Sequence, residues 1–195
     1  MNVIDERPGT VGWVAPEPAW MLRAAHAMAL DGRVWVFDPF DAEGAEERVR
    51  GLGEPAGVVQ LFARHTRDCA AWAGRLGVEL HVLPEALPGW QTIPISGPMG
   101  WREVALWDPD SATLMCAEAL ANAPGYSGAQ VGVHPFLRLT PPTHLGELPV
   151  RHLLLGHGAG VHGEDAQRAV TDALRTSRTG IPRFLAQTVR RLLPF

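Results

Sequence analysis

The sequence predicts an α/β fold, and two patterns along the chain carry that prediction. Between residues 34 and 83, a strand, helix, strand, helix and strand follow one another, which is typical of an α/β layer. Further along, three apolar runs joined by turns have the pattern of a β-meander. The 21 glycines and 17 prolines agree with a chain of many short elements connected by turns.

The first half is expected to be rich in strands. The segment 19–30 fits either a strand or a helix, and the turn residues Asp31 and Gly32 after it favour a strand that enters a hairpin. Residues 42–52 have acidic side chains early and basic side chains late, as a helix dipole favours. The remaining strands of this half are expected at 10–14, 34–37, 58–62 and 78–83.

A polar cluster follows the apolar run 58–62 and leads directly into a helix. Its five residues carry two guanidiniums, an imidazole, a hydroxyl and a carboxylate: Arg64, His65, Thr66, Arg67 and Asp68. Loops at the carboxyl ends of strands gather functional side chains in α/β proteins, so this cluster is the first candidate site. The helix has an apolar face formed by Cys69, Trp72, Ala73 and Leu76.

The second half is expected to form one domain with the first, covering 1–195 with a core of about 11–177. A stretch at 121–142, rich in glycine and proline, is predicted to be a long loop, either a lid or a binding wall. His134 and His144 lie in or beside it and are candidates for lining a pocket. The predicted elements are strands at 91–95, 103–107, 113–117 and 150–155, a helix at 164–177 and an amphipathic helix at 181–193.

Composition excludes several classes of function. The net charge of −4, the pI near 6.0 and the lack of Lys/Arg runs argue against nucleic acid or an anionic membrane as partner. No segment has the roughly 18 apolar residues of a membrane span, and the amino terminus lacks the pattern of a leader. We therefore expect a soluble, cytoplasmic protein. Two cysteines are too few for a disulfide framework or a four-thiolate zinc site.

The order of these elements and their polar ends resembles the metallo-β-lactamase superfamily. The resemblance rests on the runs 34–38, 58–68, 103–118 and 153–158 and extends over about 11–177. It implies an αββα four-layer sandwich, in which two packed mixed β-sheets carry helices on their outer faces. It also implies loops at one edge that hold one or two metal ions, usually zinc, iron or manganese.

The family's metal motif is eroded in this sequence. The motif has the form His-x-His-x-Asp-His, and its Asp falls on Asp68, but Arg64 and Thr66 occupy the first two histidine positions and Cys69 the last. The histidine of the family's Gly-His loop is missing near residues 97–100. Glu118 takes the place of the bridging Asp, and His157 remains in Gly156-His157-Gly158.

The resemblance thus leaves Asp68, Glu118 and His157 as candidate ligands of one ion, with Cys69 as a further thiolate. A dinuclear centre is not expected. Arg64 stands at a ligand position, and a guanidinium beside Asp68 and Glu118 would supply the positive charge that a metal otherwise gives. On this ground a site without metal is favoured over a site with one zinc, iron or manganese ion.

Simpler interpretations apply to the same residues. Asp68 is also the expected N-terminal residue of a helix, where an acidic side chain is common. Cys69 fits the apolar face of that helix, and a reactive thiolate there is the minor alternative. The two glycines around His157 indicate either a tight turn or a backbone that approaches another segment closely.

Three functional hypotheses remain, and the sequence leaves open whether the chain is an enzyme. In the first, the former metal cleft binds a small ligand or a partner through Arg64, His65 and Arg67. In the second, the protein is a mononuclear hydrolase of an ester, thioester or lactone, with His65 and Asp68 as catalytic groups. In the third, it is a structural module that forms homo-oligomers. No phosphate-binding loop, nucleophile elbow or dinucleotide motif competes with these hypotheses.

Overall fold

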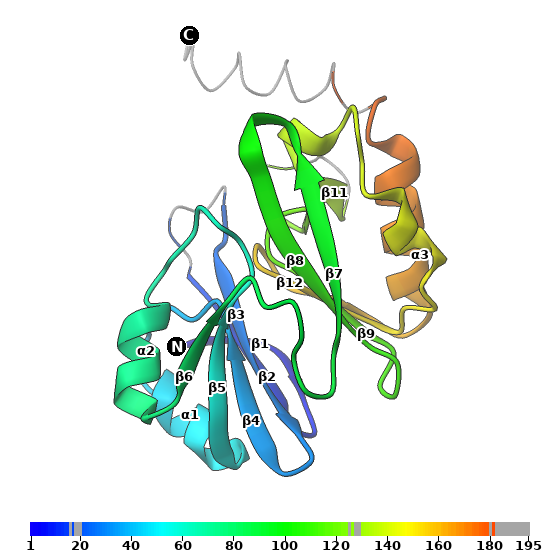
Figure 1. The fold of residues 1–195 in the computed structure, drawn as a ribbon. Coiled ribbons are helices and arrows are strands. Elements are labelled where there is room, and N and C mark those ends of the chain that lie inside the picture. The colour runs from blue at the N-terminus through cyan, green and yellow to red at the C-terminus, as the bar shows by residue number, and fades with distance from the viewer. Residues whose placement is uncertain (16, 18–20, 125, 127–129, 180, 182–195) are drawn as a thin grey trace, which may run out of the picture.

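The computed structural model describes residues 1–15, 17, 21–124, 126, 130–179 and 181. Within them, all strands but one short pair form two mixed β-sheets (Figure 1). The first sheet follows chain order: β1 (Asn2–Arg7), β2 (Thr10–Val14), β3 (Ala24–Leu30), β4 (Arg33–Phe37), β5 (Glu54–Gln60) and β6 (Glu79–Val82). The second has the order β13 (Val161–His162), β12 (His152–Leu155), β9 (Thr113–Cys116), β8 (Trp101–Asp108) and β7 (Gln91–Gly97).

Connection length decides which strands run parallel. Two-residue turns join β1 to β2 and β3 to β4, and β1 to β4 pair antiparallel in sequence. The helices α1 (Ala45–Leu52) and α2 (Cys69–Leu76) connect β4, β5 and β6, which therefore pair parallel. In the second sheet β7, β8 and β9 form the predicted meander, and β12 returns to pair parallel with β9.

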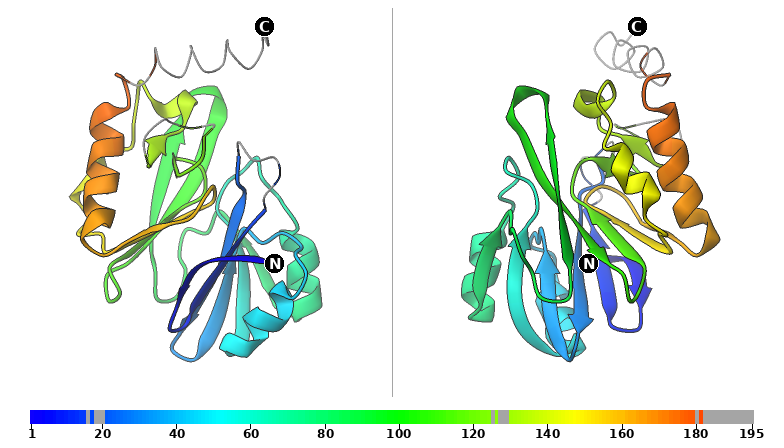
Figure 2. Two further views of the ribbon diagram at one scale, coloured as in Figure 1. Left: turned by 180° about the vertical axis from the view of Figure 1, so that it is seen from behind. Right: turned by 45° about the vertical axis from the view of Figure 1, so that its right-hand side comes forward.

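The helices cover the outer faces of the two sheets. Figures 1 and 2 show α1 and α2 outside the first sheet and α3 (Glu164–Thr176) outside the second. Strand β4 shows the division of the core: Val34 and Val36 pack on the side of α1 and α2, whereas Trp35 and Phe37 pack between the sheets. The αββα sandwich is confirmed. No helix in the described part of the chain has both the length and the apolar composition needed to cross a bilayer.

Two predicted features differ in the structure. Strand β1 precedes the expected start of the core at residue 11; it is an edge strand with mostly polar, part-exposed side chains, so it lacks an apolar pattern. Segment 121–142 is not an open loop where it is described, because it contains β11 (Gly132–Val133), paired with β10 (Leu120–Ala121), and the short helix η2 (Pro135–Leu137). Val131, Val133 and Leu137 are buried in the core, which makes the segment a wall.

The remaining predicted elements agree with the structure to within a few residues. Cys69, Trp72, Ala73 and Leu76 are all buried on one face of α2, as predicted. The strand alternative for segment 19–30 is confirmed over residues 24–30, which form β3. Apart from Ile181, the helix expected at 181–193 lies outside the described residues.

The two sheets are joined at one edge by backbone hydrogen bonds. Beyond the end of β5, Leu61 accepts a hydrogen bond from the N–H of Val104 in β8 at 2.8 Å. Beyond the end of β12, Gly156 accepts one from the N–H of Ala24 in β3, also at 2.8 Å. The loops that follow β5 and β12 are therefore held against the opposite sheet.

The glycines around His157 permit a close approach of two backbone segments. A Cβ atom at Gly156 would lie 2.2 Å from the carbonyl oxygen of Ala117, and one at Gly158 would lie 1.7 Å from that of Asn122. Gly158 also has φ +79, in the left-handed region. The interpretation of these glycines as close-approach positions is confirmed.

Gly158→Ala is expected to lower the free energy of unfolding by more than about 3 kcal/mol, because it adds a backbone clash to left-handed strain. The matched control is Gly74→Ala, in the exposed part of α2 with open space around its Cβ position. This change should stabilise the protein by about 0.5 to 1 kcal/mol. Urea unfolding measures both, and equal effects would contradict the close packing of Gly158.

Candidate functional site

Three side chains from the joined edge of the sheets converge on one point. His65 follows β5, Glu118 follows β9 and His157 follows β12. His65 Nδ1 and His157 Nε2 each lie 2.5 Å from the same atom, Glu118 Oε1. The three ligand atoms lie within 4.8 Å of one another, and no other group of this kind occurs among the described residues. Two of the three candidate ligands, Glu118 and His157, are thus brought together, and His65 joins them.

The orientation of the His157 ring is fixed from behind. His157 Nδ1 lies 2.8 Å from the carbonyl oxygen of Met21. A carbonyl only accepts, so Nδ1 carries the proton and donates it. In the neutral ring, Nε2 then presents its lone pair to Glu118. Metal-binding histidines are held in this way, because the outer hydrogen bond selects the tautomer that leaves the other nitrogen free.

Glu118 is enclosed and fully engaged. Its side chain is 2% exposed, and Oε2 accepts a hydrogen bond from the hydroxyl of Tyr126. Burial alone would raise the pKa of Glu118, but the hydrogen bonds with His157 and His65 hold it well below its usual range. Tyr126 was missed from the sequence, although it is the single tyrosine of the chain and lies in the segment predicted to wall the site.

A second buried carboxyl, Glu103 in β8, holds the turn that carries Glu118. Its Oε1 accepts hydrogen bonds from three successive backbone N–H groups, those of Ala117, Glu118 and Ala119, at 2.9, 3.0 and 3.1 Å. Burial raises the pKa of Glu103 to about 8, and Oε2 is buried without a partner among the described residues. Sequence reasoning placed Glu103 only in a strand, because nothing in its local pattern marks the contact with a turn fourteen residues away.

The two arginines of the polar cluster have different positions. Arg64 is exposed, and its guanidinium donates to the carbonyl of Met99. In the described part of the chain no ion pair joins it to Asp68 or Glu118. Arg67 instead reaches inward and donates to the carbonyls of Ala24, Asp38 and Gly156. The reason for expecting Arg64 in place of a metal is therefore removed.

Asp68 and Cys69 lie beside the cluster rather than in it. Asp68 precedes α2, and its Oδ2 accepts a hydrogen bond from the N–H of Asp41 at 2.8 Å. It is not one of the three convergent ligands, so its role as a metal ligand or catalytic group stays a prediction. Cys69 is a buried core residue, as the simpler interpretation predicts. Burial is the main cause that raises the pKa of its thiol to about 12, and the negative charge of Asp38 adds to it.

Aromatic side chains line one side of the cluster. Phe62 contacts both His65 and Trp101, with ring centroids 5.1 and 4.6 Å apart. His134 continues this wall 4.5 Å from the Trp101 ring, and burial lowers its pKa to about 4. His144 is exposed on the short helix η3 (Thr143–Glu147) and does not join the cluster. The side chain of His65 is 33% exposed, so the cluster opens to solvent on its side.

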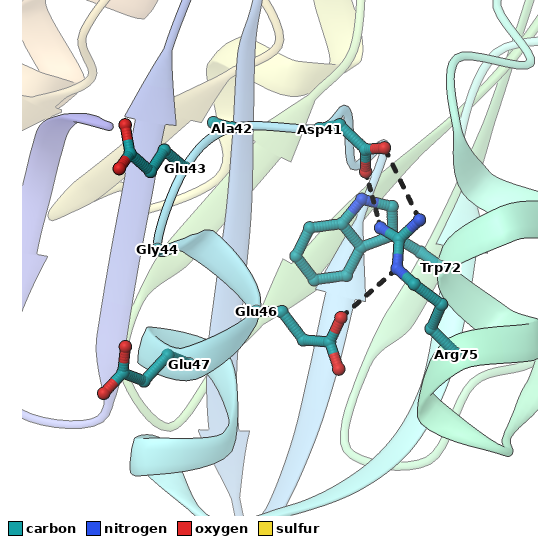
Figure 3. A pocket seen from close by; sticks show the side chains of 8 residues that line it. All are labelled: Asp41, Ala42, Glu43, Gly44, Glu46, Glu47, Trp72 and Arg75. Carbon is teal, nitrogen blue, oxygen red and sulfur yellow. Dashed lines mark hydrogen bonds and ion pairs between the residues drawn. The ribbon is translucent and has the colours of Figure 1, made fainter.

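A separate pocket of about 600 Å³ lies between the start of α1 and helix α2 (Figure 3). Arg75 pairs there with Asp41 at 2.5 Å and with Glu46 at 3.2 Å, across the face of Trp72. The guanidinium of this pocket is thus neutralised within it. Asp68 contacts the edge of this pocket, because its carboxylate accepts the hydrogen bond from the backbone N–H of Asp41. Its observed role is thus to hold the loop that precedes α1.

Arg67→Ala is expected to lower the free energy of unfolding by about 2 to 4 kcal/mol, because it removes the guanidinium donor shared by three backbone carbonyls. Arg64→Ala is the matched control, three residues earlier and exposed, with an expected change within about 0.5 kcal/mol. Urea unfolding of the two variants tests the difference. Similar losses would show that Arg67 does not hold the edge of the sheets.

Glu103→Ala is expected to cost about 3 kcal/mol of stability, since three buried N–H groups lose their acceptor. Glu103→Gln keeps a carbonyl oxygen for the same N–H groups and should cost less than half as much. Thermal and urea unfolding measure both variants. Equal losses of stability for the two substitutions would refute the role of Glu103 as acceptor for the 117–119 N–H groups.

Comparisons with known proteins give structural matches only. No known protein-family profile and no curated protein matches the sequence. TMB-1 superposes with a TM-score of 0.60 over 90% of this chain and 97% of its own, at 11% identity. The metallo-β-lactamase DIM-1 has a TM-score of 0.59 over 91% and 98%, at 13% identity. A metallo-β-lactamase from Pontibacter korlensis has 0.59 over 89% and 98%, at 12% identity. Two mixed sheets, their outer helices and these matches show that the chain has the metallo-β-lactamase fold.

Proposed function

We propose that the protein is a metal-dependent hydrolase that holds one zinc, iron or manganese ion at His65, Glu118 and His157. The observation that carries the proposal is the convergence of two imidazole nitrogens and one carboxylate oxygen within 4.8 Å. Two histidines and a glutamate form the ligand set of known zinc hydrolases, and two histidines with a carboxylate also suit iron. An ion with three protein ligands keeps open positions for water and substrate.

The electrostatics of the cluster fit a cation. Two imidazole nitrogens face one carboxylate oxygen at 2.5 Å each, and Nε2 of a neutral His157 has no proton to donate, since its proton is on Nδ1. Without a cation, His157 must carry a second proton on Nε2 to donate to Glu118, whereas His65 can donate from Nδ1 as a neutral ring. A divalent ion supplies the same positive charge to a carboxylate that is almost entirely removed from solvent.

The protein's own residues define what such a site would do. A bound divalent ion polarises a carbonyl oxygen and lowers the pKa of a bound water. Tyr126 and the turn held by Glu103 orient the Glu118 carboxylate from two sides. The open side at His65, bordered by Phe62 and Trp101, suits an apolar acyl group. The proposed substrates are therefore esters, thioesters or lactones with an apolar acyl part.

A second candidate function has its own observation. Both oxygens of Glu118 are already engaged, Oε1 by two imidazoles and Oε2 by Tyr126. This network is complete if His65 and His157 each donate a hydrogen bond to Oε1, and the open side at His65 would then bind a small ligand without metal. The measurement that tests the first function also separates it from this one.

The test is the metal content of untagged protein purified without chelator and dialysed, measured by mass spectrometry. The wild type should retain about one equivalent of zinc, iron or manganese. His65→Gln, which removes the part-exposed ligand, should lower the metal affinity by more than about 100-fold. Loss of an outer-shell partner costs up to about 100-fold, and loss of a direct ligand should cost more. His144→Gln, at an exposed histidine outside the cluster, should match the wild type.

Hydrolysis of nitrophenyl esters, acyl thioesters and lactones is measured on the same three proteins, with activity expected to follow the metal. The hydrolase proposal is refuted if the wild type retains no metal, or if wild type and His65→Gln retain equal amounts. A wild type without metal would favour the ligand-binding function.

A further inference from the structure

A second group of titratable side chains lies at the other end of β12. It joins Asp5 of β1, His26 of β3, His152 of β12 and His162 of β13. His152 is the first residue of β12, whereas His157 lies two residues past its end. Five extended residues span roughly 16 Å, so this group is separate from the His65 cluster.

Asp5 anchors the group. Its side chain is 3% exposed, and it adopts φ 53 at an irregularity in β1. Its carboxylate accepts hydrogen bonds from the N–H of Gly160, from His26 Nε2 at 2.9 Å and from His162 Nε2 at 3.0 Å. Because a carboxylate accepts, Nε2 of His162 carries a proton. The neutral His162 ring therefore turns an unprotonated Nδ1 away from Asp5.

That nitrogen faces a second imidazole at a distance suited to a shared metal ion. His152 and His162 are direct partners across β12 and β13, and their Nδ1 atoms are 3.3 Å apart. Two nitrogens bound to a tetrahedral ion at about 2.0 to 2.1 Å are separated by about 3.3 to 3.4 Å. The two lone pairs can thus meet on one ion without a change in the distance between the rings.

The arrangement also supplies the outer hydrogen bond of a metal-binding histidine. A carboxylate that accepts from the remote ring nitrogen fixes the tautomer and raises the basicity of the ligating nitrogen, and Asp5 does this for His162. The side chain of His162 is 30% exposed, which leaves room for water in the remaining coordination positions.

The donor atoms select the kind of ion. The two facing ligand atoms are imidazole nitrogens. Calcium and magnesium require several oxygen ligands, so they are disfavoured here. Copper, nickel and zinc bind imidazole, with copper the strongest of the three.

We propose that His152 and His162 form a second divalent-metal site, for copper, nickel or zinc, with Asp5 as its outer-shell carboxylate. The site would act as a two-histidine chelate at the surface of the second sheet. It does not depend on the His65 cluster or on the hydrolase proposal.

The test is a calorimetric titration of chelator-stripped, dialysed protein with Ni²⁺ and Zn²⁺. His65→Gln, which removes a ligand of the first cluster, should still bind about one equivalent. Adding His152→Gln or His162→Gln to it should each weaken that binding by more than about 100-fold. Adding His144→Gln should change nothing. The proposal is overturned if either double variant with His152 or His162 replaced binds as tightly as His65→Gln alone.

A spectroscopic measurement identifies the ligands independently of affinity. With one equivalent of Cu²⁺, electron paramagnetic resonance of His65→Gln should show coupling to two imidazole nitrogens. The signal should lose one of them in His65→Gln/His152→Gln, and an unchanged signal would overturn the assignment. Asp5→Asn should weaken binding about 10- to 100-fold at unchanged stoichiometry, and circular dichroism checks that each variant is folded.

The outcomes separate the two proposals. Ni²⁺ or Zn²⁺ that binds stripped His65→Gln in the titration, and no longer binds when His152 or His162 is also replaced, supports the second site, whatever the first cluster retains after dialysis. Binding that vanishes with His65→Gln alone would place all metal at the first cluster and refute the second site.

Discussion

The hydrogen bonds of Arg67 are the interaction on which the arrangement of the site depends. One guanidinium donates to backbone carbonyls of Ala24, Asp38 and Gly156, which lie at the ends of β3, β4 and β12 in the two different sheets. Gly156 also accepts a hydrogen bond from the N–H of Ala24, so Arg67 adds a second donor at the point where the two sheets meet. The same interactions hold the loop between β5 and α2, and that loop carries His65. One side chain thus contributes both to the contact between the sheets and to the position of the loop that carries His65.

Glu118 shows how a buried charge can be made tolerable by fixing it from several directions. Glu103 accepts hydrogen bonds from the backbone N–H of Glu118 and from those of its two neighbours in the chain. Tyr126 donates to one carboxylate oxygen of Glu118, and two imidazoles contact the other. A carboxylate held in this way does not reorganise when charge changes beside it. Such preorganisation is what allows an electrostatic centre to act strongly in a medium of low dielectric constant.

Sequence reasoning succeeded where chemistry is local and failed where it depends on distant partners. The buried face of α2, the meander and the close approach at Gly156 and Gly158 follow from periodicity or from a residue type that the backbone demands. Strand β1 was missed because an edge strand needs no apolar pattern. His65 was placed beside the motif, since its approach to Glu118 is decided by the conformation of the loop. Alignment to a motif fixes the order of residues along the chain, whereas the loop conformation decides which of them faces the cluster.

The positions of Asp5 and Gly160 in the chain have a consequence for the order of folding. The carboxylate of Asp5 binds the backbone of Gly160 across 155 positions, and the parallel pairing of β9 with β12 is also long-range. Hairpins and strand–helix–strand units close short loops and can form early. The β9–β12 pairing closes a longer loop, between residues 113 and 152, and the Asp5–Gly160 contact closes most of the chain, at the highest cost in entropy. The edge strand β1 and the 160–162 segment therefore meet last. Until then β1 and β13, which are edge strands of different sheets, lack the contact that Asp5 makes between them, and edge strands not yet held in place are where a folding chain is most open to pairing with other strands.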